Sequence, residues 1–327
     1  MCNESSFKLY SAVKESDVKW LWYPYIPLGK ITVLQGDPGD GKSTFILNLA
    51  ACLTRGTKLP DGSDIDRSMM VIYQCAEDSR SDTIKPRLMH AGADCNKIAF
   101  IEDDENSLTL EDSRLEQTII ATKASLVVLD PIQAFIPQDG DMQNASKMRT
   151  SLKKLAKLAE RNNCAIVLVG HMNKSSSGKK LYRGLGSIDI AAIARSVLMI
   201  SRDAKNPAIR YMFPVKSSLA PEGCAVGFTF DSGVGFQWIG KCYINIEEMD
   251  SQDVSFISKK DRAKELLNIM LSAGELPSVE IFCRMEKLGI SERTVREAQK
   301  ELQIRAHRKK DAWYWVKENE QGDLEEE

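Results

Sequence analysis

The sequence lacks the features of a disulfide-stapled, metal-bound or membrane-spanning protein. Its eight cysteines form no CxxC pair and follow no framework spacing, so they indicate buried thiols in a reducing compartment. Only three histidines are present, and His90 and His307 have no companion at metal-ligand spacing. No stretch approaches the roughly 18 uninterrupted apolar residues of a membrane helix, and the first residues contain no apolar leader core. These absences predict a cytoplasmic protein without membrane contact.

Neither sign of charge dominates. The 44 lysines and arginines stand against 46 aspartates and glutamates, a net charge of −2, so the chain as a whole lacks the basic surplus of a nucleic-acid coat. Any basic surface must therefore be local. With 43% hydrophobic and 28% charged residues, the composition is that of a folded globular protein. A length of 327 residues predicts one large domain and a small one, or two of similar size.

Short apolar runs alternate with helical patterns in the first half of the chain. Near-continuous apolar strands separated by helices predict a parallel α/β sheet that is covered on both faces. The expected strands are 31–36, 69–74, 125–130 and 165–170, and the expected helices are 43–54, about 81–92, about 110–123 and about 144–163. From about residue 195, four closely spaced strand-like runs predict antiparallel strands that extend the same sheet.

The chain divides by composition into a core over 1–243 and a small domain near its end. Residues 244–258 are acidic and without period, which predicts a linker. Residues 259–317 show three helical patterns and a hairpin, the arrangement of a winged helix-turn-helix. Residues 318–327 carry six acids and no base, which predicts a disordered tail.

Residues 36–43 match the phosphate-binding pattern GxxxxGK[ST], directly after an expected strand and at the start of an expected helix. Glycines let the loop backbone wrap the phosphates, and the N–H groups and helix N-terminus supply positive potential. Lys42 would reach the terminal phosphates, and the Ser43 hydroxyl would bind Mg²⁺. This strand–loop–helix context predicts an ATP site rather than a chance match. Its binding residues would be Gly36, Asp37, Pro38, Gly39, Asp40, Gly41, Lys42, Ser43 and Thr44.

Two acidic positions suit the catalysis of hydrolysis. Asp130 ends the run SLVVLD, and we expect it to hold Mg²⁺ from a strand adjacent to the loop strand. Pro131 follows it, so the common catalytic Glu directly after this Asp is absent. Glu77 closes the run VIYQCAED where ligands lie in an open parallel sheet, and it is the candidate base for the attacking water. The alternatives are a strand-end cap for Asp130 and a helix N-cap for Glu77 with Asp78.

His171 follows the strand at 165–170. A polar side chain at that strand tip could sense the γ-phosphate, and the alternative is a hydrogen-bonded histidine at a sheet end. The segment after it, Asn173-Lys174-Ser175-Ser176, lacks the Asp of the guanine-recognition pattern NKxD, so a G protein is disfavoured.

The motifs together resemble the RepA-like branch of the RecA/DnaB-type ATPases, which is typical of plasmids, phages and integrated mobile elements. They are WLWYPYIPLGKITVLQGDPGDGKST, YQCAED, LVVLDPIQAF, GHMNK, LYRGLGSIDIAAIARSVL and the closing GISERTVREAQKELQIRAHRKKDAWYW. The resemblance covers about residues 18–240, and the C-terminal helix-turn-helix that contains the last motif is a common appendage of these proteins.

This resemblance implies a RecA-like core that assembles into a ring, usually a hexamer, with ATP held between subunits. Arg195 aligns with the arginine finger of these proteins, and Lys216 with a base that reaches the neighbour's γ-phosphate. Ser217 and Ser218 stand where many ring helicases carry a second base, which weakens the parallel. The alternative is two surface bases on edge strands.

Three segments are candidates for DNA binding. The loop 173–184 combines bases with an aromatic residue in a Ser/Gly-rich chain, which suits single-stranded DNA, although a solvated loop without function would look similar. Its candidates are Lys174, Lys179, Lys180, Tyr182 and Arg183. The loop 136–149 ends in Lys147 and Arg149, but Asp139 and Asp141 weaken its claim.

The third candidate is the small domain, whose expected recognition helix begins after Ser291 and could read duplex DNA. The alternative for this domain is protein docking. The bases on neighbouring turns of that helix are Arg293, Arg296 and Lys300.

Three functions remain open on the sequence alone. The first is a DNA-dependent ATPase that acts as the replicative helicase of a mobile element. The second is a RecA-type ATPase that loads or remodels partners without unwinding DNA. The third is a DNA-binding regulator for which the nucleotide is only a switch. Glu77 and Arg195 favour hydrolysis over the switch.

Overall fold

The computed structural model describes residues 7, 9–136, 145–171, 188–203, 206–231, 235–242, 244, 259–271, 274–287, 290–309 and 312–316. Contacts divide the chain into two compact units, Met1–Cys242 and Tyr243–Glu327. Most of the expected linker and all of the expected acidic tail lie outside the described residues. Among the described residues, no helix has the length and apolar character needed to cross a membrane.

The first unit is built on a nine-stranded mixed sheet, in the order β11-β10-β9-β8-β3-β7-β6-β4-β5. Its parallel part contains β3 (Ile31–Gly36), β4 (Val71–Cys75), β5 (Ile98–Ala99), β6 (Leu126–Asp130), β7 (Ala165–His171) and β8 (Ser196–Arg202). The antiparallel extension contains β9 (Ile209–Ser217), β10 (Ala225–Asp231) and β11 (Gly235–Cys242). A small hairpin, β1 (Trp20–Trp22) with β2 (Ile26–Pro27), precedes the sheet.

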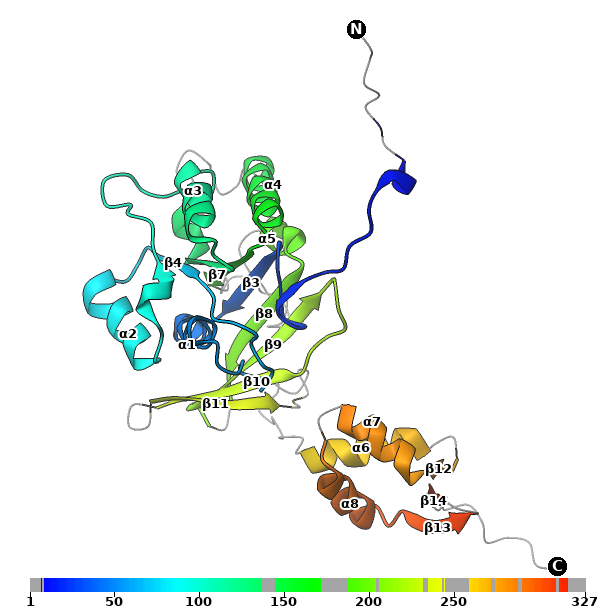
Figure 1. Cartoon of the computed structure of the whole chain (residues 1–327). Coiled ribbons are helices and arrows are strands. Elements are labelled where there is room, and N and C mark those ends of the chain that lie inside the picture. Colours follow the sequence, from blue (N-terminus) through cyan, green and yellow to red (C-terminus); the bar gives the residue numbers. More distant parts are fainter. Residues whose placement is uncertain are drawn as a thin grey trace, which may run out of the picture. The chain divides into compact units, whose positions relative to one another are not determined.

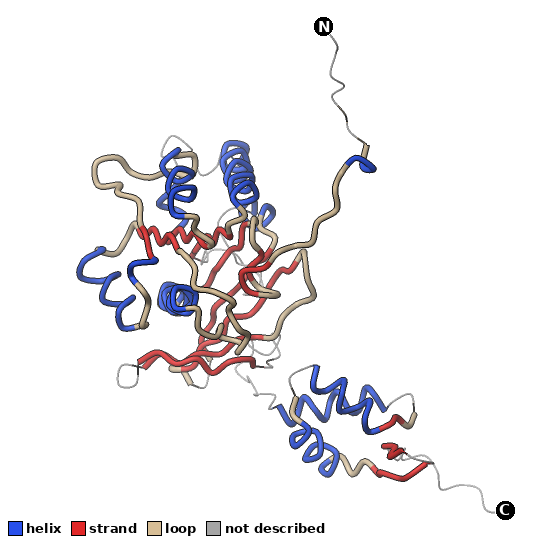
Figure 2. The backbone as a smooth tube through the Cα atoms, viewed as in Figure 1, coloured by secondary structure: helices blue, strands red, loops and turns tan. Residues whose placement is uncertain are grey.

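Helices cover both faces of this sheet (Figures 1 and 2). On one face, α1 (Lys42–Arg55), the π-helical turn η2 (Arg80–Ile84) and α2 (Lys85–His90) share a buried cluster with Leu34 of β3. On the other face, α3 (Ser113–Thr122), α4 (Ala145–Asn162) and α5 (Ile188–Ile193) share a cluster with Ile31 and Val33. Alternate side chains of β3 therefore enter opposite cores, which explains its unbroken apolar run. Short turns complete the unit: η1 (Tyr10–Ala12), η3 (Cys95–Lys97) and η4 (Ile132–Phe135).

The predicted fold class, an α/β sheet of RecA type with an antiparallel extension, is confirmed, but three details differ from the prediction. Asp130 does not lie on the strand next to the loop strand, because β7 is inserted between β3 and β6. The run that begins near residue 195 is parallel to β3, because α5 precedes it as a crossover helix, and only β9 to β11 are antiparallel additions. The helix expected at about 81–92 is a π-helical turn followed by the six-residue α2, with Pro86 in the first turn of α2.

The second unit has its own core. It contains α6 (Lys259–Leu271), β12 (Leu276–Pro277), α7 (Ser278–Lys287), α8 (Glu292–Glu301), β13 (Arg305–Lys309) and β14 (Ala312–Val316). The strands form an antiparallel sheet in the order β12-β14-β13, in which β12 was not expected. Trp315 is 2% exposed and packs with Leu267, Ile281 and Val295 of the three helices.

Candidate nucleotide site

The phosphate-binding motif forms the turn between β3 and α1, as the sequence predicts. Gly41 precedes α1 with φ of 92°, a left-handed conformation that glycine adopts without strain. Gly36 lies against β8, where a Cβ atom would be 2.5 Å from the Ile200 carbonyl oxygen. Both glycines are therefore required by the backbone path, which leaves the loop N–H groups and the α1 N-terminus for an anion.

Lys42 is the charged centre of the loop and is only 4% exposed. Its Nζ donates hydrogen bonds of 2.9 Å to the carbonyl oxygens of Gly36 and Asp37. Burial lowers the pKa of Lys42, whereas the nearby carboxylates of Asp40, Asp130, Asp37 and Glu77 raise it. The ammonium is thus held among loop carbonyls and acidic side chains before any phosphate arrives.

Asp130 lies at the end of β6 and is 5% exposed. Its Oδ2 accepts a 2.8 Å hydrogen bond from the Tyr73 hydroxyl of β4, and burial together with this carboxylate raises the pKa of Tyr73 well above its ordinary value. The bond fixes the orientation of the carboxylate although β6 is not adjacent to β3. The Ser43 hydroxyl and the Asp130 carboxylate are the hard oxygen donors that Mg²⁺ prefers, so the residues present fit this ion.

Glu77 is exposed, two residues beyond Cys75, which pairs with Asp130 in the β4–β6 register. Its charge acts on Lys42, so the structure brings the proposed base into the same electrostatic neighbourhood as the loop. His171 ends β7 opposite Gly36, which places its backbone beside the start of the loop. The described residues do not include its side chain.

Arg195 and Lys216 lie at the other end of the sheet from the loop of their own subunit. The Arg195 N–H donates a 3.0 Å bond to the carbonyl of Ile31, the first residue of β3, whereas the loop follows the last. At about 3.3 Å per residue, the six residues of β3 separate these ends by roughly 16 Å. Neither base can therefore complete the site of its own chain.

Lys216, the base that the resemblance assigns to the neighbour's γ-phosphate, makes contacts within its own subunit. Its Nζ donates 2.9 Å bonds to the carbonyls of Ala191, in α5, and of Ala194, just after it. Burial and the neighbouring Arg195 lower the pKa of Lys216. Arg195 is exposed, whereas Lys216 is partly buried.

The sequence did not reveal two arginines that contact the loop. Arg202 and Arg210 form a cross-strand pair of β8 and β9, and β8 runs beside β3 with Ile200 opposite Gly36. Arg202 Nε lies 3.1 Å from Asp40 Oδ1. The chain distance of more than 160 residues hides this contact, and only the position of Arg202 two residues beyond the run SVLMI could have suggested it.

A cavity of about 780 Å³ adjoins the loop at Thr44. Asn48 of α1 lies farther along it, where its Nδ2 donates to the Thr44 carbonyl at 2.8 Å. The opposite walls mix aromatic and basic groups, which are Arg87 and His90 of α2 with Phe230, Phe236 and Trp238 of the β10–β11 hairpin.

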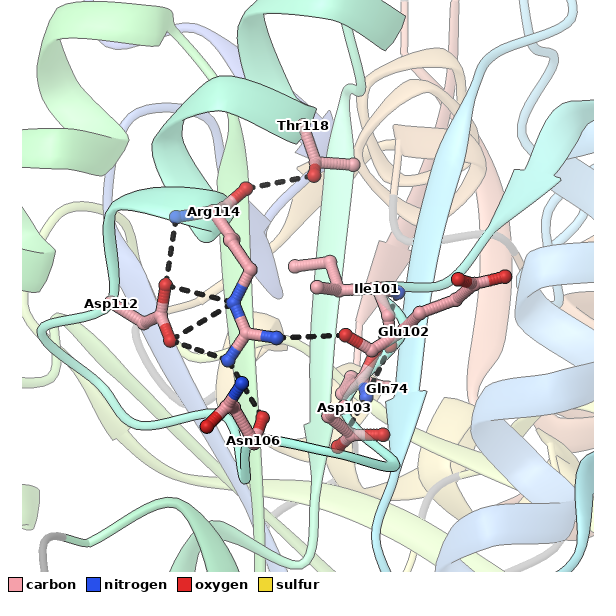
Figure 3. A network of polar contacts seen from close by, with 8 residues as sticks. All are labelled: Gln74, Ile101, Glu102, Asp103, Asn106, Asp112, Arg114 and Thr118. Carbon is pink, nitrogen blue, oxygen red and sulfur yellow. Dashed lines mark hydrogen bonds and ion pairs between the residues drawn. The ribbon is translucent and has the colours of Figure 1, made fainter.

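A second polar network braces the chain beyond β5 (Figure 3). Gln74, buried in β4, donates to the Ile101 carbonyl at 3.1 Å and accepts from the Ile101 N–H at 2.8 Å. Arg114 binds the Asp112 carboxylate and the carbonyls of Glu102 and Asn106, each through bonds of 3.1 Å or less. All these donors and acceptors satisfy one another, so the network is a structural brace.

Several predicted DNA contacts lie outside the described residues. These are Lys174, Lys179, Lys180, Tyr182 and Arg183 of the second loop. Asp139 and Asp141, the acids that weaken the claim of the first loop, also lie outside the described residues. Lys147 and Arg149 are exposed near the start of α4.

In the second unit, Arg293 and Arg296 project from α8 and are 89% and 61% exposed. Each bonds to a glutamate of the same helix, at 3.1 Å to Glu297 and 2.6 Å to Glu292. Lys300 is also exposed on this helix. Ser291 caps the helix, because its Oγ accepts the Thr294 N–H.

The mostly parallel sheet, the glycine loop with its buried lysine and the oriented Asp130 define a RecA-like P-loop ATPase core. Residues 4–177 match the AAA domain family AAA_25, which is more than half of the 327 residues, and the chain belongs to this family. Among the residues that the structure describes, no group of three or more His, Cys, Asp and Glu side chains could hold a metal.

The chain is also similar to curated DNA repair proteins RadA. The identity is 28% over 152 residues with the protein of Listeria monocytogenes, covering 46% of this chain and 29% of that protein. With the protein of Rickettsia conorii it is 29% over 167 residues, covering 48% and 33%. The chain thus spans about a third of the length of these relatives. A solved KaiC-like protein of Pyrococcus horikoshii OT3 shows 17% identity and a TM-score of 0.48, covering 65% of this chain and 90% of that one.

Proposed function

We propose that the protein is a Mg²⁺-dependent ATPase that acts on DNA, and that it works as a ring-forming replicative helicase of a plasmid, phage or integrated mobile element. The observation that carries the ring is the placement of Arg195 at the opposite end of β3 from the loop of its own chain. A base there can reach a phosphate only in a neighbouring subunit. A head-to-tail assembly that closes on itself, such as a hexamer, gives every loop such a partner.

Within one site, the residues divide the work of hydrolysis. Lys42 and the loop N–H groups bind the β- and γ-phosphates, and Ser43 with Asp130 would hold Mg²⁺, which neutralises charge on the phosphate oxygens when bound. Glu77 accepts the proton of the attacking water. Arg195 of the adjacent subunit stabilises the charge of the transferring phosphoryl group. His171, at the tip of β7, would sense the γ-phosphate and relay its loss to the chain that follows.

The nucleoside end of the nucleotide has room in the cavity beside Thr44. Its volume of about 780 Å³ is within the usual range of roughly 300–1,000 Å³ for small-molecule sites. Aromatic walls suit a stacked base, and Asn48 offers a polar group at the loop end of the cavity.

DNA would be bound by two parts of the chain. The loop with Lys174, Lys179, Lys180, Tyr182 and Arg183 would bind a single strand. The second unit would act as a winged helix-turn-helix on duplex DNA, and the support is its three helices, its three-stranded sheet and the exposed arginines of α8. Glu292 and Glu297 must release Arg296 and Arg293 for contact with phosphate or bases. The same acids favour the alternative, a protein-docking unit.

The similarity to DNA repair proteins RadA supports a second candidate, an ATPase that loads or remodels partners on DNA without unwinding it. One experiment separates the possibilities. ATP turnover is measured with and without single-stranded DNA on size-fractionated protein, followed by unwinding of a forked duplex. Stimulated turnover with unwinding supports the helicase, and stimulated turnover without unwinding supports the loader. Nucleotide binding without turnover would leave only a nucleotide-switched regulator.

A further inference from the structure

Arg202, the last residue of β8, connects this strand to the phosphate loop within one subunit. Its Nε lies 3.1 Å from Asp40 Oδ1, and its Nη2 donates a hydrogen bond to the Gly39 carbonyl. A Cβ atom on Gly39 would come within 2.9 Å of that Nη2. The guanidinium therefore contacts two adjacent residues in the middle of the loop.

These two contacts fix the orientation of the peptide between Gly39 and Asp40. A trans peptide directs its carbonyl and its N–H to opposite sides. Because the Gly39 carbonyl points to Arg202, the N–H of Asp40 points inward across the turn, where it donates to the Asp37 carbonyl at 3.2 Å. Asp37 N–H closes the turn from the other side with a 3.2 Å bond to Asp40 Oδ2.

The charge of Asp40 explains why a positive side chain is needed beside the loop. Its side chain is 12% exposed, and burial together with Asp37 raises its pKa, whereas Arg202 lowers it. An unpaired carboxylate at this position would repel a polyphosphate in the same loop. Arg202 offsets that charge, and its own side chain remains 44% exposed.

Arg210 packs against the same loop at Gly41. It is 7% exposed, and its side chain would lie 3.2 Å from a Cβ atom on Gly41. Its Nη1 donates to the carbonyls of Ala208 and Phe230, and its Nε has no hydrogen-bond partner among the residues that the structure describes. The loop thus rests on two positive side chains, of which only Arg202 contacts a loop carboxylate through a short ion pair.

We propose that Arg202 is a positioning residue for nucleotide binding, which acts through Asp40 by shaping the middle of the loop and by neutralising a carboxylate beside the phosphates. This inference rests on the proposed ATP site and deepens it. Arg202 serves the loop of its own subunit, in contrast to Arg195. It touches no reacting atom, so its effect belongs in nucleotide affinity and KM rather than in kcat.

The test is a double-mutant cycle read by calorimetric binding of Mg·ADP and by steady-state ATP hydrolysis. Arg202→Ala should raise the Kd roughly fiftyfold, the effect of one unpaired charge about 7 Å from a phosphate charge at an effective dielectric constant of about 20. Arg202→Lys should give a smaller loss, because an ammonium cannot reproduce the two-point contact. Asp40→Asn removes the carboxylate that Arg202 neutralises, so adding Arg202→Ala to it should raise the Kd much less than Arg202→Ala does in the unaltered chain, each Kd being compared with that of its own background.

The matched control is Arg161→Ala, which removes an arginine of α4 from an exposed ion pair with Glu116 of α3 and should leave the Kd unchanged. A loss in Arg202→Ala that persists at full size in the Asp40→Asn background would overturn the proposal, since Arg202 would then act on the nucleotide itself. An unchanged Kd in Arg202→Ala, or a loss confined to kcat, would overturn it too. If the unaltered protein binds no nucleotide, the proposed function fails instead. Recovery of binding in the double variant rules out misfolding as the cause of the loss.

Discussion

Subunit mixing tests the shared site most directly. Arg195→Ala leaves the loop of a subunit intact but removes the base that it offers to its neighbour, and Lys42→Ala does the reverse. Each variant alone should be inactive. In a ring assembled from equal amounts of both, an interface works only when an Arg195→Ala loop meets a Lys42→Ala neighbour. With independent sites and random assembly, about one quarter of the interfaces should recover activity.

The expected recovery of one quarter depends on the roughly 16 Å between the ends of β3, because this separation prevents Arg195 from reaching the loop of its own subunit. The assay is ATP turnover of the co-assembled mixture, with mixed rings verified by affinity capture of one tagged variant. Lys42→Ala mixed with Asp130→Ala is the matched control, since both positions belong to the same half of the site and no interface is complete. Proven co-assembly of the first pair without recovered turnover would refute the shared site.

The other predictions concern the loop chemistry and the DNA contacts. Lys42→Ala should abolish ATP binding, whereas Glu77→Gln should preserve binding and remove turnover; near-normal hydrolysis in Glu77→Gln would move the base elsewhere. Burial lowers the pKa of Lys42, so its side chain is fully charged at low pH and loses its proton at a lower pH than the ordinary 10.5. ATP affinity measured across alkaline pH should therefore fall at a lower pH than a free lysine would give. Deleting 259–327 should spare turnover and single-strand binding but reduce duplex binding; intact duplex binding would make the second unit a docking module. When three loop bases are neutralised, the slope of the logarithm of the single-strand binding constant against the logarithm of salt concentration should fall by about one unit per lost phosphate contact. An unchanged slope would exclude that loop as a DNA contact. These bases are Lys179, Lys180 and Arg183.

Local patterns predicted local structure well. The run 31–36 is β3 residue for residue, and α1 begins at Lys42 because the preceding glycines take the backbone through the turn that opens it. Asp130 and Glu77 could be proposed as site residues because side chains at the carboxyl ends of parallel strands meet at one edge. Each of these inferences needs only neighbours in the chain and the direction of the strands.

Strand order and long-range contacts could not be predicted in this way. The insertion of β7 between β3 and β6 depends on how the crossover helices pack on the two faces, which no single strand encodes. The Arg202–Asp40 contact requires β8 to lie beside β3, and it joins residues far apart in the sequence. The contacts of Lys216 were hidden for the same reason, because its sequence context shows a base on a strand but not the carbonyls of Ala191 and Ala194 to which it bonds.

The buried ammonium of Lys42 has a consequence for the life of the protein in the cell. Taking this charge out of water is unfavourable, as its lowered pKa shows, so the chain gives up folding free energy to keep the loop ready. A bound nucleotide returns stability by mass action, in proportion to the logarithm of its concentration over Kd. Nucleotide bound at the loop would then lengthen the time for which each copy resists unfolding and proteolysis.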